Sequence, residues 1–248
     1  MTQSFIFTVI ALFLGSVGSV LLAGLILLLK EQHLQRITHL LTYLAGGTLL
    51  GSALLGMIPE AAGMLEIGKV LNVVLAGIIF FFVLEKIILW RVCSDASCER
   101  NFHAAAPMVL FGDAFHNAID GVIIAAAFLT SNNFGWLVTL SVVFHEVPQE
   151  LGDFGILLRS GMKRSKALFY NALSGASALL LGIVAYFSLN FAKSLIPYAL
   201  AFSAASFLYI ALADLIPEMH RKTSVKESMV QIFFILCGIM LIYFFGRD

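Results

Sequence analysis

The chain of 248 residues is predicted to be an all-α membrane protein with eight transmembrane helices, on three observations. Hydrophobic residues make up 60% of the sequence and charged residues only 12%, whereas soluble domains carry about 25% charge. Apolar runs near the length of about 20 residues that a bilayer-crossing helix needs recur along the whole chain. The connections between these runs are short and leave no room for a soluble domain.

Eight apolar runs follow one another, and each is expected to form a helix because a bilayer leaves no partner for unpaired backbone groups. The first is too long for the apolar core of a signal peptide and lacks a basic start, so it is kept as a span. The runs cover residues 4–29, 37–58, 70–90, 108–130, 135–158, 167–188, 194–217 and 229–246.

Lys and Arg are unequally divided between the two sides of the membrane. Eleven follow the odd-numbered runs, namely Lys30, Arg36, Arg91, Arg100, Arg159, Lys163, Arg164, Lys166, Arg221, Lys222 and Lys226. The other side holds three, Lys69, Lys193 and Arg247. Because positive charge stays cytoplasmic, both termini are expected outside, in a plasma membrane or a bacterial inner membrane. The formal net charge of +0 gives no indication of nucleic-acid binding.

A short repeated tripeptide predicts an inverted repeat, in which the first three helices correspond to the last three and flank the fourth and fifth. The second run ends in Ile58-Pro59-Glu60 and the seventh in Ile216-Pro217-Glu218. The two tripeptides would lie on opposite sides of the membrane, as inverted repeats require.

Two polar clusters interrupt runs that should be buried in lipid. The fourth run contains Asp113, His116, Asn117 and Asp120, and the fifth contains His145, Glu146, Gln149, Glu150 and Asp153. A carboxylate near the bilayer centre costs roughly 3 kcal/mol on insertion scales. Neither cluster contains Lys or Arg, so a bound divalent cation is the simplest compensation for five such groups.

Helical geometry places each cluster on one side of its helix. At 100° per residue the four polar groups of the fourth run fall within about 100°, and those of the fifth within about 140°. Most lie near mid-membrane, whereas Asp113 and Asp153 lie about 10 Å towards the cytoplasm at 1.5 Å per residue. The pattern predicts a midplane site with an exit lined by acid.

The types of donor atom in the two clusters limit which metal ion they can bind. Imidazole, carboxylate and amide oxygen without thiolate suit Zn2+, Fe2+ or Mn2+ and argue against Cu+. An all-oxygen Ca2+ or Mg2+ site would not need two histidines.

The motifs His116-Asn117-x-x-Asp120-Gly121 and His145-Glu146-x-Pro148-x-Glu150-Leu-Gly-Asp153 resemble those of the ZIP (Zrt/Irt-like) family of divalent-metal transporters. The resemblance covers essentially the whole chain, as a single transporter domain of residues 1–248. It implies a binuclear midplane centre on the fourth and fifth helices, built by His116, Asn117, Asp120, His145, Glu146 and the residue at position 149. Many members have His there, where this chain has Gln149.

The resemblance also implies that Asn171 lies near a second metal, and that Asp214 and Glu218 line the cytoplasmic exit. Glu150 joins the predicted midplane ligands, and Asp113 and Asp153 join the exit. The expected substrate is Zn2+, with Fe2+, Mn2+ or Cd2+ as alternatives, moved into the cytoplasm by alternating access. The expected partners are the ion and the lipid bilayer, and a homodimer is left open.

Two other classes of function compete with transport. An intramembrane zinc metalloenzyme could use His145 and Glu146, since His145-Glu146-x-x-Gln149 is similar to the zincin motif His-Glu-x-x-His. The second ligand histidine is missing, however, and Pro148 would distort the turn that brings positions 145 and 149 together. A metal sensor without transport would lack any soluble output domain.

Overall fold

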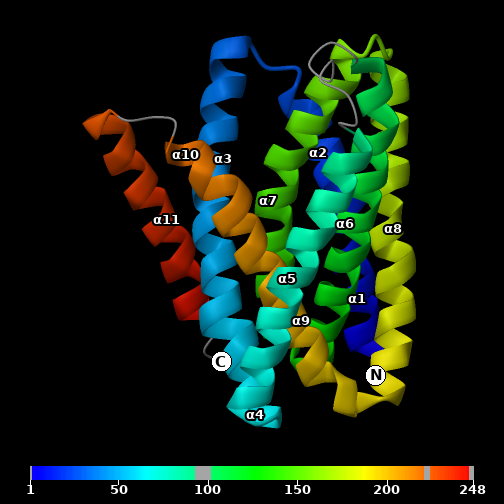
Figure 1. Ribbon diagram of the computed structural model, residues 1–248, viewed down its shortest axis with the longest axis vertical. Helices are drawn as coiled ribbons and strands as arrows, with labels where there is room; N and C mark the ends of the chain where they lie inside the picture. The colour runs from blue at the N-terminus through cyan, green and yellow to red at the C-terminus, as the bar shows by residue number, and fades with distance from the viewer. Residues whose placement is uncertain (1, 93–101, 221–223, 246–248) are drawn as a thin grey trace.

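The computed structural model describes residues 2–92, 102–220 and 224–245, and every regular element within them is helical. Eight passes cross the molecule in these residues (Figure 1). In chain order they are α1 (Thr2–Phe13), η1 (Leu14–Gly18) and α2 (Ser19–Ile26); α3 (Glu31–Gly51), η2 (Ser52–Met57) and α4 (Ile58–Met64); α5 (Ile67–Val92); α6 (Phe102–Thr130); α7 (Asn132–Arg159); α8 (Arg164–Phe191); α9 (Ile196–Tyr209), η5 (Ile210–Leu215) and α10 (Ile216–His220); and α11 (Val225–Phe245). The short 3-10 turn η4 (Lys193–Leu195) precedes α9.

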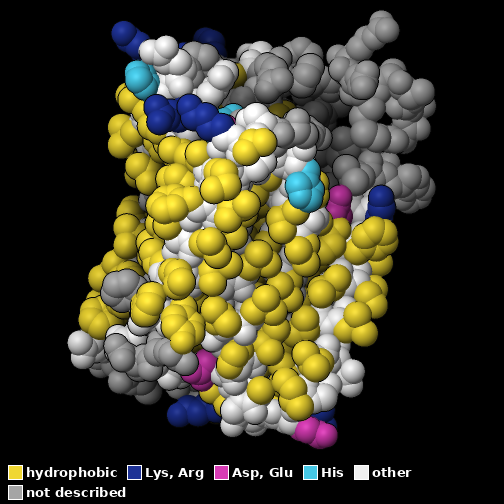
Figure 2. All heavy atoms as spheres, turned by 90° about the vertical axis from the view of Figure 1, so that its left-hand side faces the viewer, with side chains coloured by type: hydrophobic (Ala, Val, Ile, Leu, Met, Phe, Trp, Pro, Cys, Tyr) yellow, Lys and Arg dark blue, Asp and Glu magenta, His cyan; other side chains and the backbone are white. Residues whose placement is uncertain are grey.

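By length and composition, seven passes of the described chain are long and apolar enough to cross a membrane. The pass outside this set is α7, a helix of 28 residues that carries Glu146, Glu150 and Asp153. On the face shown in Figure 2, hydrophobic side chains cover the middle of the molecule, and charged side chains gather towards its two ends. The prediction of an all-α, multi-pass membrane protein is therefore confirmed.

Several helices begin before the apolar runs do. α3 starts at Glu31 rather than near residue 37, and α6 starts at Phe102 rather than near residue 108. Hydrophobicity marks only the lipid-buried part of a helix, whereas the helix itself continues until its backbone hydrogen bonds end. Lys30, in extended conformation, precedes the first turn of α3.

Close helix contacts divide the molecule into two bundles. In the first, α8 packs along α6, and α1, η1 and α2 pack on α6, α7 and α8. In the second, α11 packs along α3, and α5 packs along α9 (Figure 1). The bundles meet where α3 contacts α7 and where α9 contacts α6.

Glycines permit the closest of these contacts. A Cβ added to Gly121 of α6 would lie 2.2 Å from the Ala178 carbonyl oxygen of α8, and one added to Gly47 of α3 would lie 2.1 Å from the Ile235 carbonyl oxygen of α11. On α5, a Cβ at Gly77 would lie 2.5 Å from the Ala205 Cβ. All three contacts lie within a bundle, so each bundle is tightly held together.

Two pairs of helix contacts are related in the way that the predicted inverted repeat requires. In such a repeat α3 corresponds to α9, α5 to α11, and α6 to α7. The contact between α3 and α11 then corresponds to that between α9 and α5, and both are present. The contact between α3 and α7 likewise corresponds to that between α9 and α6. A π-helical segment precedes Ile-Pro-Glu in both halves, η2 before Ile58 and η5 before Ile216. α4 lies at the lower end of the molecule and α10 near the upper end (Figure 1).

A tight connection places the two polar clusters side by side. α6 ends at Thr130 and α7 begins at Asn132. Between them, Ser131 caps α7, because its side chain accepts a 3.1 Å hydrogen bond from the Phe134 backbone N–H. The two helices then run antiparallel in contact, and their polar faces meet halfway along the bundle.

Candidate metal centre

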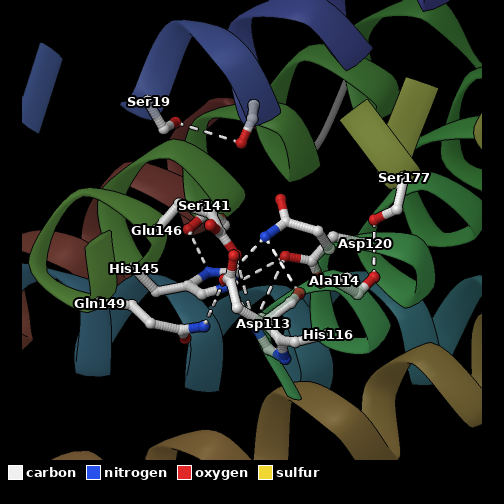
Figure 3. A network of polar contacts seen from close by, with 12 residues as sticks. Ser19, Asp113, Ala114, His116, Asp120, Ser141, His145, Glu146, Gln149 and Ser177 are labelled. Carbon is white, nitrogen blue, oxygen red and sulfur yellow. Dashed lines mark hydrogen bonds and ion pairs between the residues drawn. The ribbon is translucent and has the colours of Figure 1, made fainter. Parts of the chain in front are cut away.

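Four side chains from the two motifs converge on one point between α6 and α7 (Figure 3). His116 and Asp120 come from α6, and His145 and Glu146 come from α7. The His116 Nε2 lies 3.3 Å from the His145 Nε2 and 3.3 Å from the Glu146 Oε1. The His145 Nε2 lies 3.0 Å from the Asp120 Oδ2. One ligand atom from each residue lies within 4.8 Å of all the others, so the four could share one metal ion.

The orientation of the His145 ring is set by the backbone of its own helix. Its Nδ1 lies 2.9 Å from the Ser141 carbonyl oxygen, one turn earlier. A carbonyl oxygen can only accept, so Nδ1 carries a proton and donates it. The Nε2 lone pair of the neutral ring then faces the Asp120 carboxylate, which also only accepts. Two acceptors 3.0 Å apart repel unless they share a proton or a metal ion, so this pair of atoms suits a bound cation.

A second group of acids adjoins the first and shares Glu146. Asp113 of α6 and Glu150 of α7 each place a carboxylate oxygen within 4.8 Å of the other and of a Glu146 oxygen. The two groups together therefore offer ligands for two neighbouring ions, bridged by Glu146. This second group contains oxygen donors only, whereas the first supplies two imidazole nitrogens and two carboxylates.

Many oxygens of this region are buried without a hydrogen-bond partner. Glu146 and Glu150 are 0% exposed, and neither oxygen of either carboxylate has such a partner. The same holds for Asp113 Oδ2, Asp120 Oδ1 and Asn117 Oδ1. Buried polar atoms are normally paired, because an unpaired one costs about 1–3 kcal/mol and more when charged. A cation coordinated by these oxygens would satisfy them.

The two amides of the motifs both donate to Asp113. The Asn117 Nδ2 lies 2.9 Å from the Asp113 Oδ1, and the Gln149 Nε2 lies 3.4 Å from the same atom. Gln149 therefore turns its N–H towards a neighbouring acid in this structure. That arrangement gives no support to the zincin-like pairing of positions 145 and 149.

The remaining predicted residues are placed as follows. Asn171 of α8 is 0% exposed, its amide lies beside the Glu150 carboxylate, and its Oδ1 has no hydrogen-bond partner. Asp153 is half-buried on the same helix as Glu150, one turn further on. Asp214 lies in η5 and Glu218 in α10, but their side chains fall outside the described part of the chain.

Sequence reasoning did not identify the residues that hold the centre in place. Two serines of α8 donate to carbonyl oxygens of α6: Ser174 Oγ to Leu110 at 3.0 Å, and Ser177 Oγ to Ala114 at 2.6 Å. The buried Phe207 of α9 presents its ring to that of His145, with centroids 5.6 Å apart. Ser174 and Ser177 are small residues that suit close helix packing, but no signal in the sequence indicated their bonding partners.

The known proteins that this chain resembles are zinc transporters by name. The family model of the ZIP zinc transporters matches residues 3–100 and 93–246. "Zinc transporter ZIP13" of Pongo abelii is 31% identical over 236 residues, which cover 89% of this chain and 70% of that protein.

Two longer relatives match the chain over a shorter stretch. "Zinc transporter zipt-7.2" of Caenorhabditis elegans is 35% identical over 150 residues, and "Zinc transporter foi" of Drosophila melanogaster is 36% identical over 144 residues. Each match covers 58% of this chain, but only 32% and 20% of the two relatives. With the family model matching nearly its whole length, the chain belongs to the ZIP zinc transporter family.

Proposed function

We propose that this protein transports a divalent metal ion, Zn2+ before others, across the membrane into the cytoplasm. The observation that carries the proposal is the pair of adjoining ligand groups in the interior of a membrane-spanning bundle. Burial of several carboxylates inside a membrane-spanning bundle is energetically costly. In membrane proteins, buried ionisable groups of this kind mark substrate pathways. The ligands are His116, Asn117, Asp120, His145, Glu146 and Glu150, with Asn171 near the second ion.

The donor set supports zinc as the substrate of the first group. Two imidazoles with two carboxylates form a four-donor set of nitrogen and oxygen, which suits tetrahedral Zn2+. Fe2+, Mn2+ and Cd2+ are the competing ions. The names of the relatives refer to zinc in each case given above.

The distribution of Lys and Arg supports the direction of transport. The more basic side is cytoplasmic by the positive-inside rule, which places both termini outside in a plasma membrane or a bacterial inner membrane. Asp153, Asp214 and Glu218 then follow the centre on its cytoplasmic side. Acidic side chains there would lower the barrier for a cation that leaves the centre.

Alternating access between the two bundles is the mechanism we favour. Every ligand named above is on α6, α7 or α8, so the whole centre belongs to the first bundle. Glycine-mediated backbone contacts hold each bundle together, as at Gly121 and Gly47. A displacement of the first bundle along the second would carry the ion across without dismantling its ligands.

Reconstituted protein tests the proposal. Purified protein in proteoliposomes should accumulate Zn2+ inside in a time-dependent and saturable way, with Fe2+, Mn2+ and Cd2+ compared as competitors. A His116→Ala protein serves as the inactive reference in the same vesicles. Uptake by the wild-type protein that is no faster than by His116→Ala would refute transport through this centre.

A further inference from the structure

We propose that Asp113 is a ligand of the second ion, and that Gln149 is a positioning residue that holds Asp113 in place without binding metal itself. The half-site formed by Asp113, Glu146 and Glu150 then contains oxygen donors only and takes a hard divalent cation such as Mn2+. This inference rests on the proposed transport function and reassigns two residues within it. The sequence pattern had placed Asp113 on the exit and Gln149 among the ligands.

The two oxygens of Asp113 have different surroundings. Oδ1 accepts from the Asn117 amide at 2.9 Å and from the Gln149 amide at 3.4 Å. Oδ2 is buried without a hydrogen-bond partner. Because an ionised carboxylate only accepts, the amide atoms that face Oδ1 are the N–H groups. Two donors on one oxygen fix the carboxylate plane and leave the other oxygen free for a cation.

The other members of the half-site also have free oxygens. Glu150 is 0% exposed with both carboxylate oxygens unpartnered, and one of its oxygens reaches within 4.8 Å of those of Asp113 and Glu146. Asn171 supplies an independent indication, because its amide is fully buried beside Glu150 with Oδ1 unpartnered. A cation between these groups would satisfy three carboxylates and could take the amide oxygen as a fourth ligand.

Donor chemistry separates this half-site from its neighbour. His116 and His145 supply nitrogen to the first group alone. Carboxylate and carbonyl oxygens suit hard ions such as Mn2+, whereas imidazole favours zinc. The two ions of the centre are therefore predicted to differ in preference, with Glu146 as the shared ligand.

Electron paramagnetic resonance of Mn2+ tests this directly, since the signal of free Mn2+ falls as the ion binds. The full-length protein, purified in detergent with one equivalent of Zn2+, is titrated with Mn2+ alone. Asp113→Asn should weaken Mn2+ binding by at least about 100-fold, beyond the effect expected for a partner that only orients a ligand. Gln149→Leu should weaken it by about 10-fold, within the range for such an orienting partner. Both variants should keep the wild-type affinity for the first Zn2+.

Asp153→Asn is the matched control, because it removes the same charge one turn from Glu150 but outside both ligand groups. It should bind Mn2+ as the wild type does. Wild-type protein that binds no Mn2+, or Asp113→Asn protein that binds it normally, would overturn the half-site. A loss of the first Zn2+ in Gln149→Leu would show that Gln149 is itself a ligand. Failure of zinc uptake in vesicles would refute the transport function but leave these binding results unaffected.

Discussion

The Nε2 atoms of His116 and His145 lie 3.3 Å apart, although the two residues belong to different helices. Two imidazole nitrogens bound to one tetrahedral zinc at 2.0–2.1 Å would lie about 3.3–3.4 Å apart. The spacing between the helices thus already matches the spacing of two ligands on one ion. Ser141 helps to set this spacing, because its carbonyl oxygen is hydrogen-bonded to Nδ1 of His145 and so fixes the orientation of the ring.

Removal of a ligand from the first group should abolish zinc uptake. His116→Ala leaves three protein donors in place of four, so we expect zinc affinity to fall by at least about 100-fold, since even orienting partners cost 10–100-fold. Folding should persist, because the close contacts at glycines that hold each bundle together do not involve His116. The measurements are zinc titration and vesicle uptake, with thermal unfolding to verify the fold. His33→Ala, an exposed histidine of α3, is the matched control and should behave as the wild type.

Zinc affinity should weaken as the pH falls from about 7 to 5. The imidazoles and carboxylates bind metal only through lone pairs that protons also occupy, so each bound ion must displace protons. More protons bound to the free protein at low pH mean a higher apparent Kd. Titrations at several pH values, with proton release followed in weak buffer, measure this. An affinity that stays constant across the range would exclude a centre built from these donors.

The fold was largely predictable, because eight apolar runs of bilayer length leave few alternatives. The position of each polar cluster on one side of its helix was predictable too. His116 and Asp120 share a face at helical spacing, as do His145 and Gln149. The pairing of side chains between helices was not. Axial distance placed Asp113 about a turn and a half from the midplane, but its side chain reaches Glu146 and Glu150 across the α6–α7 contact.

The hydrogen bond of Gln149 could not be read from the sequence for the same reason. Its partner, Asp113, lies on another helix, and the helical period describes only the face that a residue occupies. The π-helical segments η2 and η5 also left no pattern that hydrophobicity could detect.

Gly121→Ala should destabilise the protein strongly. The added methyl group would lie 2.2 Å from the Ala178 carbonyl oxygen, so α6 and α8 would have to separate. Overpacking of this kind costs about 1–3 kcal/mol and occasionally more. Gly112→Ala is the matched control on the same helix, because a Cβ there meets nothing within 4 Å. Thermal unfolding in detergent should show a lower Tm for the first variant and no loss for the second, and equal Tm values would contradict the close contact.

Asp153→Asn should slow transport with little effect on affinity. Asp153 lies one helical turn beyond Glu150 and outside both ligand groups. An acid in that position stabilises a cation that has left the centre, so its neutralisation should raise the barrier to release. Uptake rate and zinc Kd measured on the same protein separate the two effects. A fall in affinity that matches the fall in rate would make Asp153 a ligand instead.

Ser52→Ala should change the transport rate through a hydrogen bond that joins the two bundles. The Ser52 Oγ of η2 lies 2.7 Å from the Ser141 Oγ of α7, and both residues are buried. Ser141 also lies 3.2 Å from the Leu137 carbonyl oxygen, so its own proton goes there and Ser52 donates to Ser141. Sliding of one bundle along the other would break this bond in every cycle. A net contribution of about 1 kcal/mol corresponds to a change of roughly 5-fold in the balance between the two states.

The matched control is Ser16→Ala, because Ser16 is equally buried but its hydroxyl bonds to the Leu12 carbonyl oxygen of its own bundle at 2.6 Å. Ser16→Ala should transport at the wild-type rate. The double variant Ser52→Ala/Ser141→Ala should resemble Ser52→Ala alone, because the two hydroxyls act as one pair in a double-mutant cycle. Zinc affinity should be retained throughout, since the Ser141 carbonyl oxygen that orients His145 is part of the backbone. If Ser52→Ala and Ser16→Ala transport at equal rates, the contact between Ser52 and Ser141 does not move during transport.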